Sequence, residues 1–283
     1  MDLNLELTRY LYSKIEVKQS LLLALLERKS DESLFWTYEL YFSGFTDDCF
    51  EYVANIYEEI YSFDNPGLRQ SIQKIWDEWT DDNNKHWLVG TIIMTLVPRN
   101  YRLTNFMESY FGVKCLEQQP VRDVPNFVVK LKEKDIEKYK TVVPDVPRNY
   151  LKLGCKYSIR KETDELFTTD PAEFENEFKY HWLYYCRNTP FWGEKICECE
   201  GTYCDETKTI SFPNDELSDK FYDTWGIEPD EQPRDIIERC IGKKDVSQLS
   251  IADFCKKYGS SIVMKKLRIR ASNGTVTNSI QYT

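Results

Sequence analysis

The sequence predicts a mainly α-helical protein, in which an N-terminal helical bundle or short solenoid is followed by a mixed α+β domain with a small antiparallel β element. Two observations predict the helical part. Apolar residues recur at three- and four-residue steps through the first hundred residues, and the first glycine and the first proline of the chain are Gly44 and Pro66. A third observation predicts the mixed part, because prolines and short alternating stretches become frequent after Pro98.

Residues 30–61 are expected to form a helical hairpin around Gly44, which takes a C′ position where positive φ costs glycine nothing. Thr46 can cap the second helix, with Asp47 and Asp48 in its first turn. Rings at helical spacing usually pack a core, whereas the alternative is a partner-binding groove. Each helix of the hairpin carries one stripe of such residues. The stripe on the first helix is Leu34, Phe35, Tyr38, Tyr41 and Phe42, and the stripe on the second is Phe50, Val53, Ala54, Tyr57, Ile60 and Tyr61.

Further helices are expected on both sides of this hairpin, joined by short connections that favour antiparallel packing. Pro66 is tolerated at a first helical position and Pro98 cannot continue a helix, so the two prolines mark a beginning and an end. The expected helices cover residues 3–14, 15–29, 66–79, 87–97 and 101–112.

Four prolines, Pro120, Pro125, Pro144 and Pro147, mark the best boundary region of the chain. They bracket a short strand candidate and a charged helix, at residues 127–131 and 132–139. We therefore predict a helical domain, a proline-containing connector and a mixed α+β domain with a basic C-terminal segment, over residues 1–113, 114–149 and 150–283.

Helical and extended patterns alternate in the last part of the chain. Residues 170–173 resemble a capping box that opens a helix to about residue 185. Asn273 and Gly274 form a turn signal. The other expected strands are residues 150–159, 195–200, 207–212 and 262–269, and the other expected helices are residues 214–225, 232–241 and one opened by Ser250.

The composition predicts a folded protein that is not secreted. The apolar fraction is 41 %, the charged fraction is 30 % with mixed signs, and the N-terminus carries acids where a signal peptide needs bases. The longest apolar run, residues 87–97, is too short for a membrane span. An odd count of nine cysteines indicates reduced thiols. We expect a location in the cytoplasm or nucleus, or in a particle assembled there, and no membrane partner.

Charge is distributed unevenly along the chain. Residues 1–97 contain 8 Lys/Arg and 17 Asp/Glu, a net charge of −9, whereas residues 241–283 contain 8 Lys/Arg and 2 Asp, a net charge of +6. The basic end could contact nucleic acid or an acidic protein surface, and the alternative is a solvated edge strand. The candidate contact residues are Lys256, Lys257, Lys265, Lys266, Arg268 and Arg270.

A second group of candidates contains thiols. Four soft ligands within reach of each other could bind zinc, but the common zinc-finger spacing is missing, and free cysteine often acts as a small buried hydrophobe. The weak metal candidates are His181, Cys186, Cys197, Cys199 and Cys204, of which Cys197 and Cys199 would share one face of a strand. No catalytic residue or other cofactor is predicted, because the sequence contains no nucleophile elbow, P-loop, dinucleotide-binding or zinc-protease motif.

Two strings resemble an uncharacterised protein family of large nucleocytoplasmic (giant) DNA viruses. They are FWTYELYFSGF at residues 35–45 and GIEPDEQP at residues 226–233. The resemblance covers about 20 residues directly, and the order of elements is similar over most of the chain. It implies a protein made in the cytoplasm or nucleus of an infected cell, either built into virions or serving viral replication or transcription. It transfers no functional residue.

Three functional hypotheses follow. The first is a non-enzymatic protein–protein interaction or structural protein of a large DNA virus, with other proteins, among them viral ones, as partners. The second is a nucleic-acid accessory factor that uses the basic C-terminal segment. The third is an unrecognised metal-dependent enzyme.

Overall fold

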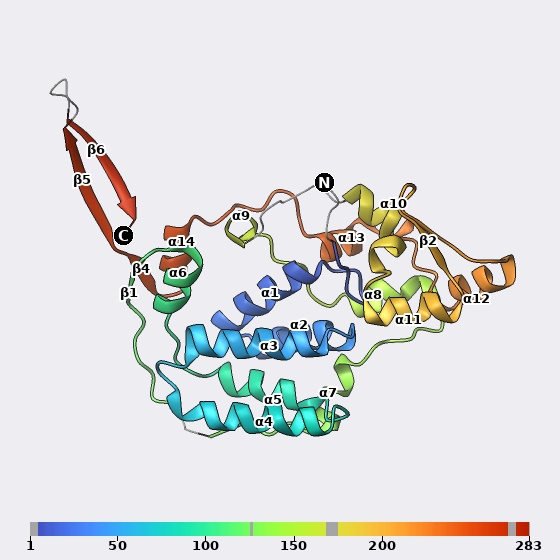
Figure 1. Cartoon of the computed structure of the whole chain (residues 1–283), viewed down its shortest axis with the longest axis horizontal. Helices are drawn as coiled ribbons and strands as arrows, with labels where there is room; N and C mark the ends of the chain where they lie inside the picture. The colour runs from blue at the N-terminus through green and yellow to red at the C-terminus, as the bar shows by residue number, and fades with distance from the viewer. Residues whose placement is uncertain (1–4, 125–126, 168–174, 271–275, 283) are drawn as a thin grey trace.

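The computed structural model describes residues 5–124, 127–167, 175–270 and 276–282, and for residues 264–282 it describes the backbone alone. The chain is mainly helical, as predicted, with short antiparallel β elements (Figure 1). The predicted capping box at residues 170–173 and the predicted turn at residues 273 and 274 lie outside the described residues. Within the described part, no helix has both the length and the apolar character needed to cross a membrane.

The first five helices form three layers (Figure 1). Helix α2 packs between α1 and α5, while α3 lies beside α2, and α4 lies beside α5. The helix α3 continues into a π-helical turn, Tyr57–Tyr61, and a 3-10 turn, Pro66–Leu68, precedes α4. The bounds are α1 (Lys14–Leu26), α2 (Ser30–Phe42), α3 (Thr46–Ile56), α4 (Arg69–Asp81) and α5 (Trp87–Leu96).

The predicted hairpin is confirmed in α2 and α3. Gly44 has φ of +92°, and a Cβ added there would lie 2.4 Å from the Cβ of Pro190, so both the turn and the packing against α11 (Pro190–Glu198) require glycine. Tyr38 and Tyr61 are fully buried, and almost all other members of the two stripes are buried as well. These rings therefore pack the core rather than line an open groove.

The predicted helix over residues 3–14 is wrong for the residues described there. Leu7 pairs with Ser13 in an isolated antiparallel bridge, and Leu11 has φ of +61°, which a helix cannot accommodate. The segment is instead a buried turn that anchors the second half of the chain. The indole Nε1 of Trp192 donates to the carbonyl oxygen of Thr8 at 3.2 Å, and the ring of Tyr10 packs against that of Tyr150 at 5.1 Å.

The remaining elements surround this helical body. The helices are α6 (Thr104–Phe111), α7 (Glu133–Ile136), α8 (Tyr150–Gly154), α9 (Asp164–Phe167), α10 (Glu175–Cys186), α11 (Pro190–Glu198), α12 (Asp215–Trp225), α13 (Arg234–Ile241) and α14 (Ile251–Lys257). The strands form two-stranded antiparallel sheets: β1 (Cys115–Glu117) with β4 (Ser260–Ile262), β2 (Thr202–Cys204) with β3 (Thr209–Ser211), and β5 (Met264–Arg270) with β6 (Val276–Tyr282).

Three predicted strands are wrong. Residues 150–154 form α8, and residues 195–198 belong to α11, so the hairpin consists of β2 and β3 on either side of a turn. Residues 127–131 form no strand, because this segment donates the backbone N–H groups of Val129 and Leu131 to the hydroxyls of Thr95 and Thr91 on α5, at 3.0 and 3.1 Å. These two backbone N–H groups are thus paired with side chains of a helix and not with a neighbouring strand.

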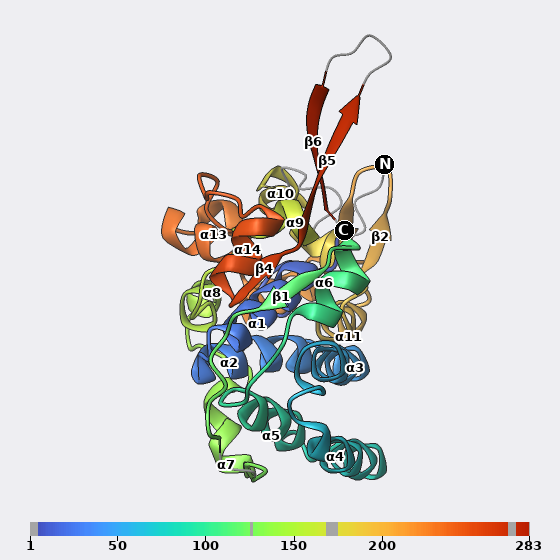
Figure 2. The same cartoon turned by 90° about the vertical axis from the view of Figure 1, so that its left-hand side faces the viewer.

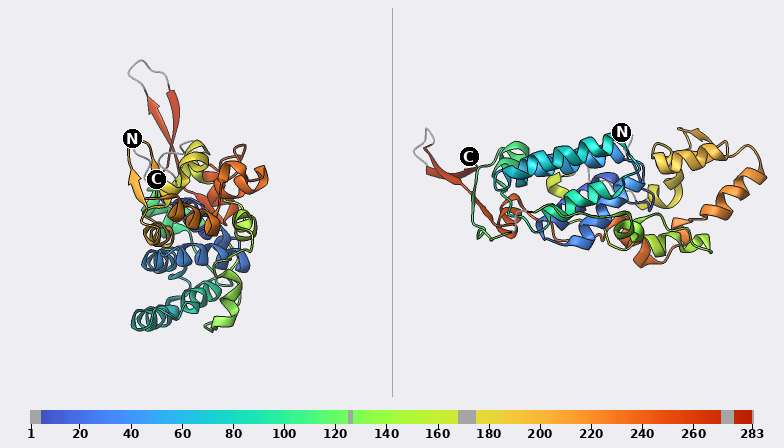
Figure 3. Two further views of the ribbon diagram at one scale, coloured as in Figure 1. Left: turned by 90° about the vertical axis from the view of Figure 1, so that its right-hand side faces the viewer. Right: turned by 90° about the horizontal axis from the view of Figure 1, so that it is seen from below.

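The molecule is elongated, with α10, α11 and α12 at one end and β5 with β6 at the other (Figure 3). In two perpendicular views β5 and β6 extend away from the helical body beyond α6, β1 and β4 (Figures 1 and 2). One buried apolar cluster takes residues from every part of the chain up to Tyr258. The domain boundaries after residues 113 and 149 stay predictions.

Candidate functional site

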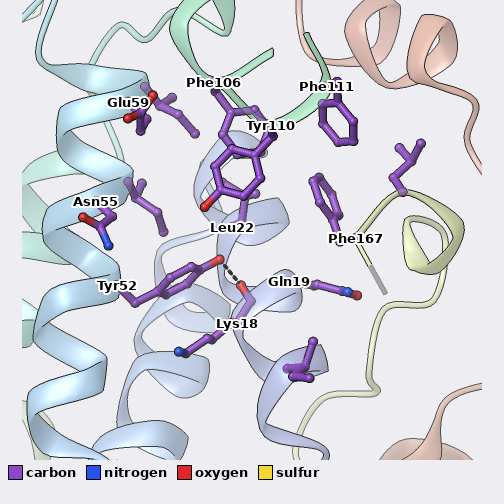
Figure 4. A pocket seen from close by; sticks show the side chains of 14 residues that line it. Lys18, Gln19, Leu22, Tyr52, Asn55, Glu59, Phe106, Tyr110, Phe111 and Phe167 are labelled. Atoms are coloured by element: carbon purple, nitrogen blue, oxygen red, sulfur yellow. Dashed lines mark hydrogen bonds between the residues drawn. The ribbon is translucent and has the colours of Figure 1, made fainter. Parts of the chain in front are cut away.

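An open apolar cavity of about 240 Å³ lies between α1, α3 with its π-helical turn, α6 and α9 (Figure 4). We call it the ring-lined cavity. Its lining is Ile15, Lys18, Gln19, Leu22, Tyr52, Asn55, Ile56, Glu59, Ile60, Phe106, Tyr110, Phe111, Leu166 and Phe167.

Helical periodicity explains two of the four walls. The α1 residues recur at positions 15, 18, 19 and 22, and the residues of α3 and its π-helical turn recur at positions 52, 55, 56, 59 and 60. Steps of three and four place each set on one helix face, so each wall presents a mixed face whose apolar members are Ile15 and Leu22 on one side and Ile56 and Ile60 on the other.

Aromatic rings of α6 and α9 close the opposite side. Phe167 lies 5.6 Å from Phe111 and 6.0 Å from Phe106 between ring centroids, and Phe106 lies 4.8 Å from Tyr110. Such tilted ring contacts add to the stability gained from burying the rings. The mouth stays open to solvent, since Tyr110 is 64 % exposed and Ile15 is 51 % exposed.

Three polar side chains of the cavity, Lys18, Tyr52 and Glu59, have partners within the chain. The Tyr52 hydroxyl donates to the carbonyl oxygen of Lys18 at 2.7 Å, as the dashed line in Figure 4 shows, and its burial raises its pKa. The Lys18 ammonium is paired with Asp48. Glu59 accepts a hydrogen bond from the Ser109 hydroxyl at 3.1 Å. The cavity therefore offers mainly apolar surface to a ligand.

A second hollow of about 360 Å³ lies between α3 and α4. We call it the Trp76 groove, and its lining is Glu51, Ala54, Asn55, Ile72, Gln73 and Trp76. Asn55 borders both this groove and the ring-lined cavity. The two hollows therefore flank the same stretch of α3.

The five metal candidates are divided between buried and exposed positions. Cys186 and Cys199 are buried, whereas Cys197 and Cys204 are exposed. The expectation that Cys197 and Cys199 share a strand face is wrong, because Cys197 lies in α11 and Cys199 follows the end of that helix. Among the described side chains, no three His, Cys, Asp or Glu residues form a group that could hold a metal ion.

His181 lines a separate polar pocket of about 210 Å³ between α10, β3 and α12. Its Nδ1 lies 3.0 Å from the carbonyl oxygen of Lys208. A carbonyl oxygen can only accept, so Nδ1 carries the proton and Nε2 is the acceptor in the neutral ring. The cations of this pocket are engaged, since Lys179 pairs with Glu175, and Lys208 pairs with Glu177.

The six basic candidates fall into two groups. Lys257, at the end of α14, is paired with Glu27 at 3.1 Å and Glu162 at 3.6 Å, which reduces its availability for a partner. Lys256 is its exposed neighbour. The other four candidates, Lys265, Lys266, Arg268 and Arg270, are all in β5, whose backbone pairs with β6.

Comparison with protein-family models, with curated proteins and with solved structures found no match to this chain. Sequence reasoning missed the ring-lined cavity, although the spacing of Ile15 and Leu22 places them on one helix face and was a partial signal. The walls from α6 and α9 carried no such signal, because they join α1 only through the tertiary fold.

Proposed function

We propose that this protein is a non-enzymatic interaction protein that binds another protein through the ring-lined cavity. The observation that carries the proposal is an open apolar cavity with large apolar side chains exposed at its mouth. A folded chain gains free energy by covering such a surface, and exposed apolar patches rimmed by polar residues mark interaction sites.

The size of the cavity fits a partner side chain. An engineered apolar cavity of about 150 Å³ accepts a benzene molecule. The ring-lined cavity, at about 240 Å³, can therefore take one aromatic ring or one or two aliphatic side chains. A buried anchor in a pocket, surrounded by contacts that exclude water, is the usual centre of a protein interface.

Site-specific photo-crosslinking tests the proposal. A photoreactive phenylalanine replaces Tyr110 at the cavity mouth, and in a matched control it replaces Tyr203 in β2, which is 62 % exposed against 64 % for Tyr110. We expect a discrete crosslinked protein from position 110 alone. Adding Ile15→Asn, which makes the mouth polar without adding charge, should abolish that product. Equal crosslinking at both positions, or a product that survives Ile15→Asn, would contradict the proposal.

The resemblance of residues 35–45 and 226–233 to proteins of large DNA viruses extends the proposal to an infected cell. In that setting the partner is a viral protein, and the chain acts in the host cytoplasm or nucleus or within the virion. Mass spectrometry of purified particles tests the virion role. Absence of the protein from particles that contain the ordinary capsid proteins would count against it.

A second candidate function, nucleic-acid binding, is favoured by the position of β5 and β6. Strand β5 contains Lys265, Lys266, Arg268 and Arg270 and no acid, β6 contains no charged residue, and this ribbon extends from the body (Figures 1 and 2). A two-stranded ribbon fits the major groove of B-form DNA but not the narrow major groove of duplex RNA.

Salt-dependent binding to a DNA duplex tests this candidate. If the four basic residues contact phosphates, changing all four to Gln should reduce the slope of log K against log salt by roughly 3–4. The matched control changes four exposed lysines of the body, Lys130, Lys134, Lys152 and Lys220, and should leave the slope unchanged. Equal effects of the two variants, or equal affinity for duplex RNA, would overturn the candidate.

A further inference from the structure

We infer that the occupant of the ring-lined cavity is a basic amphipathic helix of a partner protein, held by the acidic surface of α3 and α4. This inference rests on the proposed function and names the chemical class of the partner. Its evidence is the charge around the cavity and the pair of hollows on the two sides of α3.

The segment from the start of α3 to the residue after α4 is strongly acidic. Residues 46–82 contain 10 Asp/Glu and 2 Lys/Arg, which gives a net charge of −8 in 37 residues. This segment therefore accounts for most of the total net charge of −10. An excess of one sign on one surface attracts partners of the opposite sign and repels others.

Internal ion pairs leave much of this charge uncompensated. Asp48, Glu58, Asp64 and Glu78 are paired with Lys or Arg. Within the described residues, the other six acids of this segment form no ion pair with a lysine or arginine. They are Asp47, Glu51, Glu59, Asp77, Asp81 and Asp82. Glu59 lies at the ring-lined cavity, and Glu51 lies at the Trp76 groove. The acids thus stand beside the apolar surface and can pair with bases of a ligand.

The two hollows favour a helix as the ligand. The ring-lined cavity and the Trp76 groove both border Asn55, so one segment that crosses α3 there can place apolar side chains in both. A helix satisfies its own backbone hydrogen bonds, and its apolar residues recur on one face at three- and four-residue steps. Lysines or arginines beside that face would meet Glu51 and Glu59.

The same charges exclude other ligand classes from this surface. A nucleic acid would bring phosphates against uncompensated carboxylates, and an acidic helix would do the same with its own carboxylates. The ionic part of the binding free energy should weaken with added salt, whereas the apolar part should persist.

Designed peptides test the inference with the full-length protein. One labelled peptide carries leucines on one helix face and lysines on the other, a second replaces every lysine by glutamate, and a third replaces every lysine by glutamine. Fluorescence anisotropy at about 50 mM and about 500 mM NaCl measures their affinities. We expect the lysine peptide to bind most tightly and to lose affinity at high salt, and the glutamate peptide not to bind.

Two variants connect the binding to the acids named above. The triple variant Asp47→Asn, Glu51→Gln and Glu59→Gln should weaken lysine-peptide binding about tenfold at low salt. The control Asp215→Asn, Glu216→Gln and Asp219→Asn removes three exposed acids of α12 and should leave binding unchanged. Equal weakening by the two variants would overturn the inference.

The outcomes separate the inference from the proposed function. If the glutamine peptide binds as tightly as the lysine peptide and blocks crosslinking at position 110, the interaction function stands and the basic partner is wrong. If no peptide binds and position 110 yields no specific product, both are wrong.

Discussion

Arg9 and Glu39 form an ion pair that is removed from water. Arg9 Nε lies 3.0 Å from Glu39 Oε2, and the side chains are 1 % and 0 % exposed. The guanidinium also donates to the Thr141 hydroxyl and the Tyr139 carbonyl oxygen, at 3.0 and 2.8 Å. The other carboxylate oxygen accepts the backbone N–H of Tyr10 at 3.0 Å. The pair therefore joins the N-terminal turn, α2 and the segment after α7.

Glu39→Gln is expected to lower the free energy of unfolding by about 3–5 kcal/mol, because it leaves the Arg9 charge buried and uncompensated. Urea denaturation followed by circular dichroism measures the change. Glu58→Gln is the control, since Glu58 pairs with Arg69 on the surface, where such pairs contribute about 0–1 kcal/mol. Similar losses in the two variants would show that the buried pair has no special role.

Glu16 and Asp164 share one ammonium, that of Lys161, at a buried position between α1 and α9. Burial raises the pKa of Glu16 to about 7, and Lys161 offsets only part of that effect. The pKa of Asp164 is raised for the same reason. One buried cation thus serves two carboxylates, and Glu16 Oε2 and Asp164 Oδ1 have no hydrogen-bond partner among the described residues.

A raised carboxyl pKa makes the folded state bind protons more tightly than the unfolded state. Stability should therefore fall as pH rises from about 4.5 to about 7, by about 3 kcal/mol from Glu16, and the pH dependence from this group should vanish above that range. Glu16→Gln removes the titrating group, so the variant should gain stability relative to the native chain between pH 5 and pH 8. Urea denaturation across this range measures the difference, and parallel pH profiles for the two proteins would contradict the prediction.

At the scale of elements, Gly44 illustrates a feature that sequence reasoning can predict. Glycine directly after an apolar helical stripe indicates a C′ position, and the structure has φ of +92° there. The proximity of Pro190 in α11 could not be predicted, because it depends on a contact between residues far apart in the sequence. Local chemistry thus predicts the turn, and the tertiary fold adds a second constraint.

Gly44→Ala is expected to destabilise the protein by more than about 1 kcal/mol, since the new Cβ meets both an unfavourable φ and the Pro190 ring. Gly67→Ala is the matched control, because a Cβ at Gly67 meets no atom within 4 Å and its φ is not positive. That control should be neutral or slightly stabilising. Thermal unfolding of both variants measures the contrast, which equal shifts in the melting temperature would contradict.

Short elements were the hardest to predict from sequence. Residues 150–159 and 195–200 alternate weakly, and over so few residues a strand pattern and the end of a helix are alike. The structure places helices there, α8 and the end of α11. Ser250, by contrast, was predicted correctly as a helix start, because its hydroxyl accepts the N–H of Asp253 at 3.1 Å, a local interaction encoded by neighbouring residues.

At the scale of the whole molecule, charge asymmetry was visible in the sequence, whereas the ring-lined cavity was not. A count of charged residues along the sequence is enough to predict the acidic N-terminal part and the basic C-terminal part. The cavity forms only when Phe167 of α9 and Leu22 of α1 line the same space. This arrangement depends on the contacts that hold the segment around Arg160 against α1 and α2. The Arg160 backbone N–H donates to the Ser20 hydroxyl at 3.2 Å, and its guanidinium pairs with Glu32.

The N-terminal turn and α11 share one core, which makes a prediction about folding. Trp192 of α11 is fully buried, packs edge-on against Tyr150 at 6.1 Å and donates to the Thr8 carbonyl oxygen. Residues from the N-terminal turn and from α8 and α11 therefore bury the same apolar surface, so neither part can open without exposing the other. We expect the slowest-exchanging amides of α2 and α11 to have the same free energy of opening and the same urea dependence.

Native-state hydrogen exchange with mass spectrometry measures these free energies. Trp192→Ala should lower both by about 3–5 kcal/mol, because it leaves a cavity in the shared core. Tyr203→Ala removes an exposed ring of β2 and should lower neither. If α11 opened alone, with α2 fully protected in Trp192→Ala, the two parts would be independent folding units, and the predicted boundary after residue 149 would separate them.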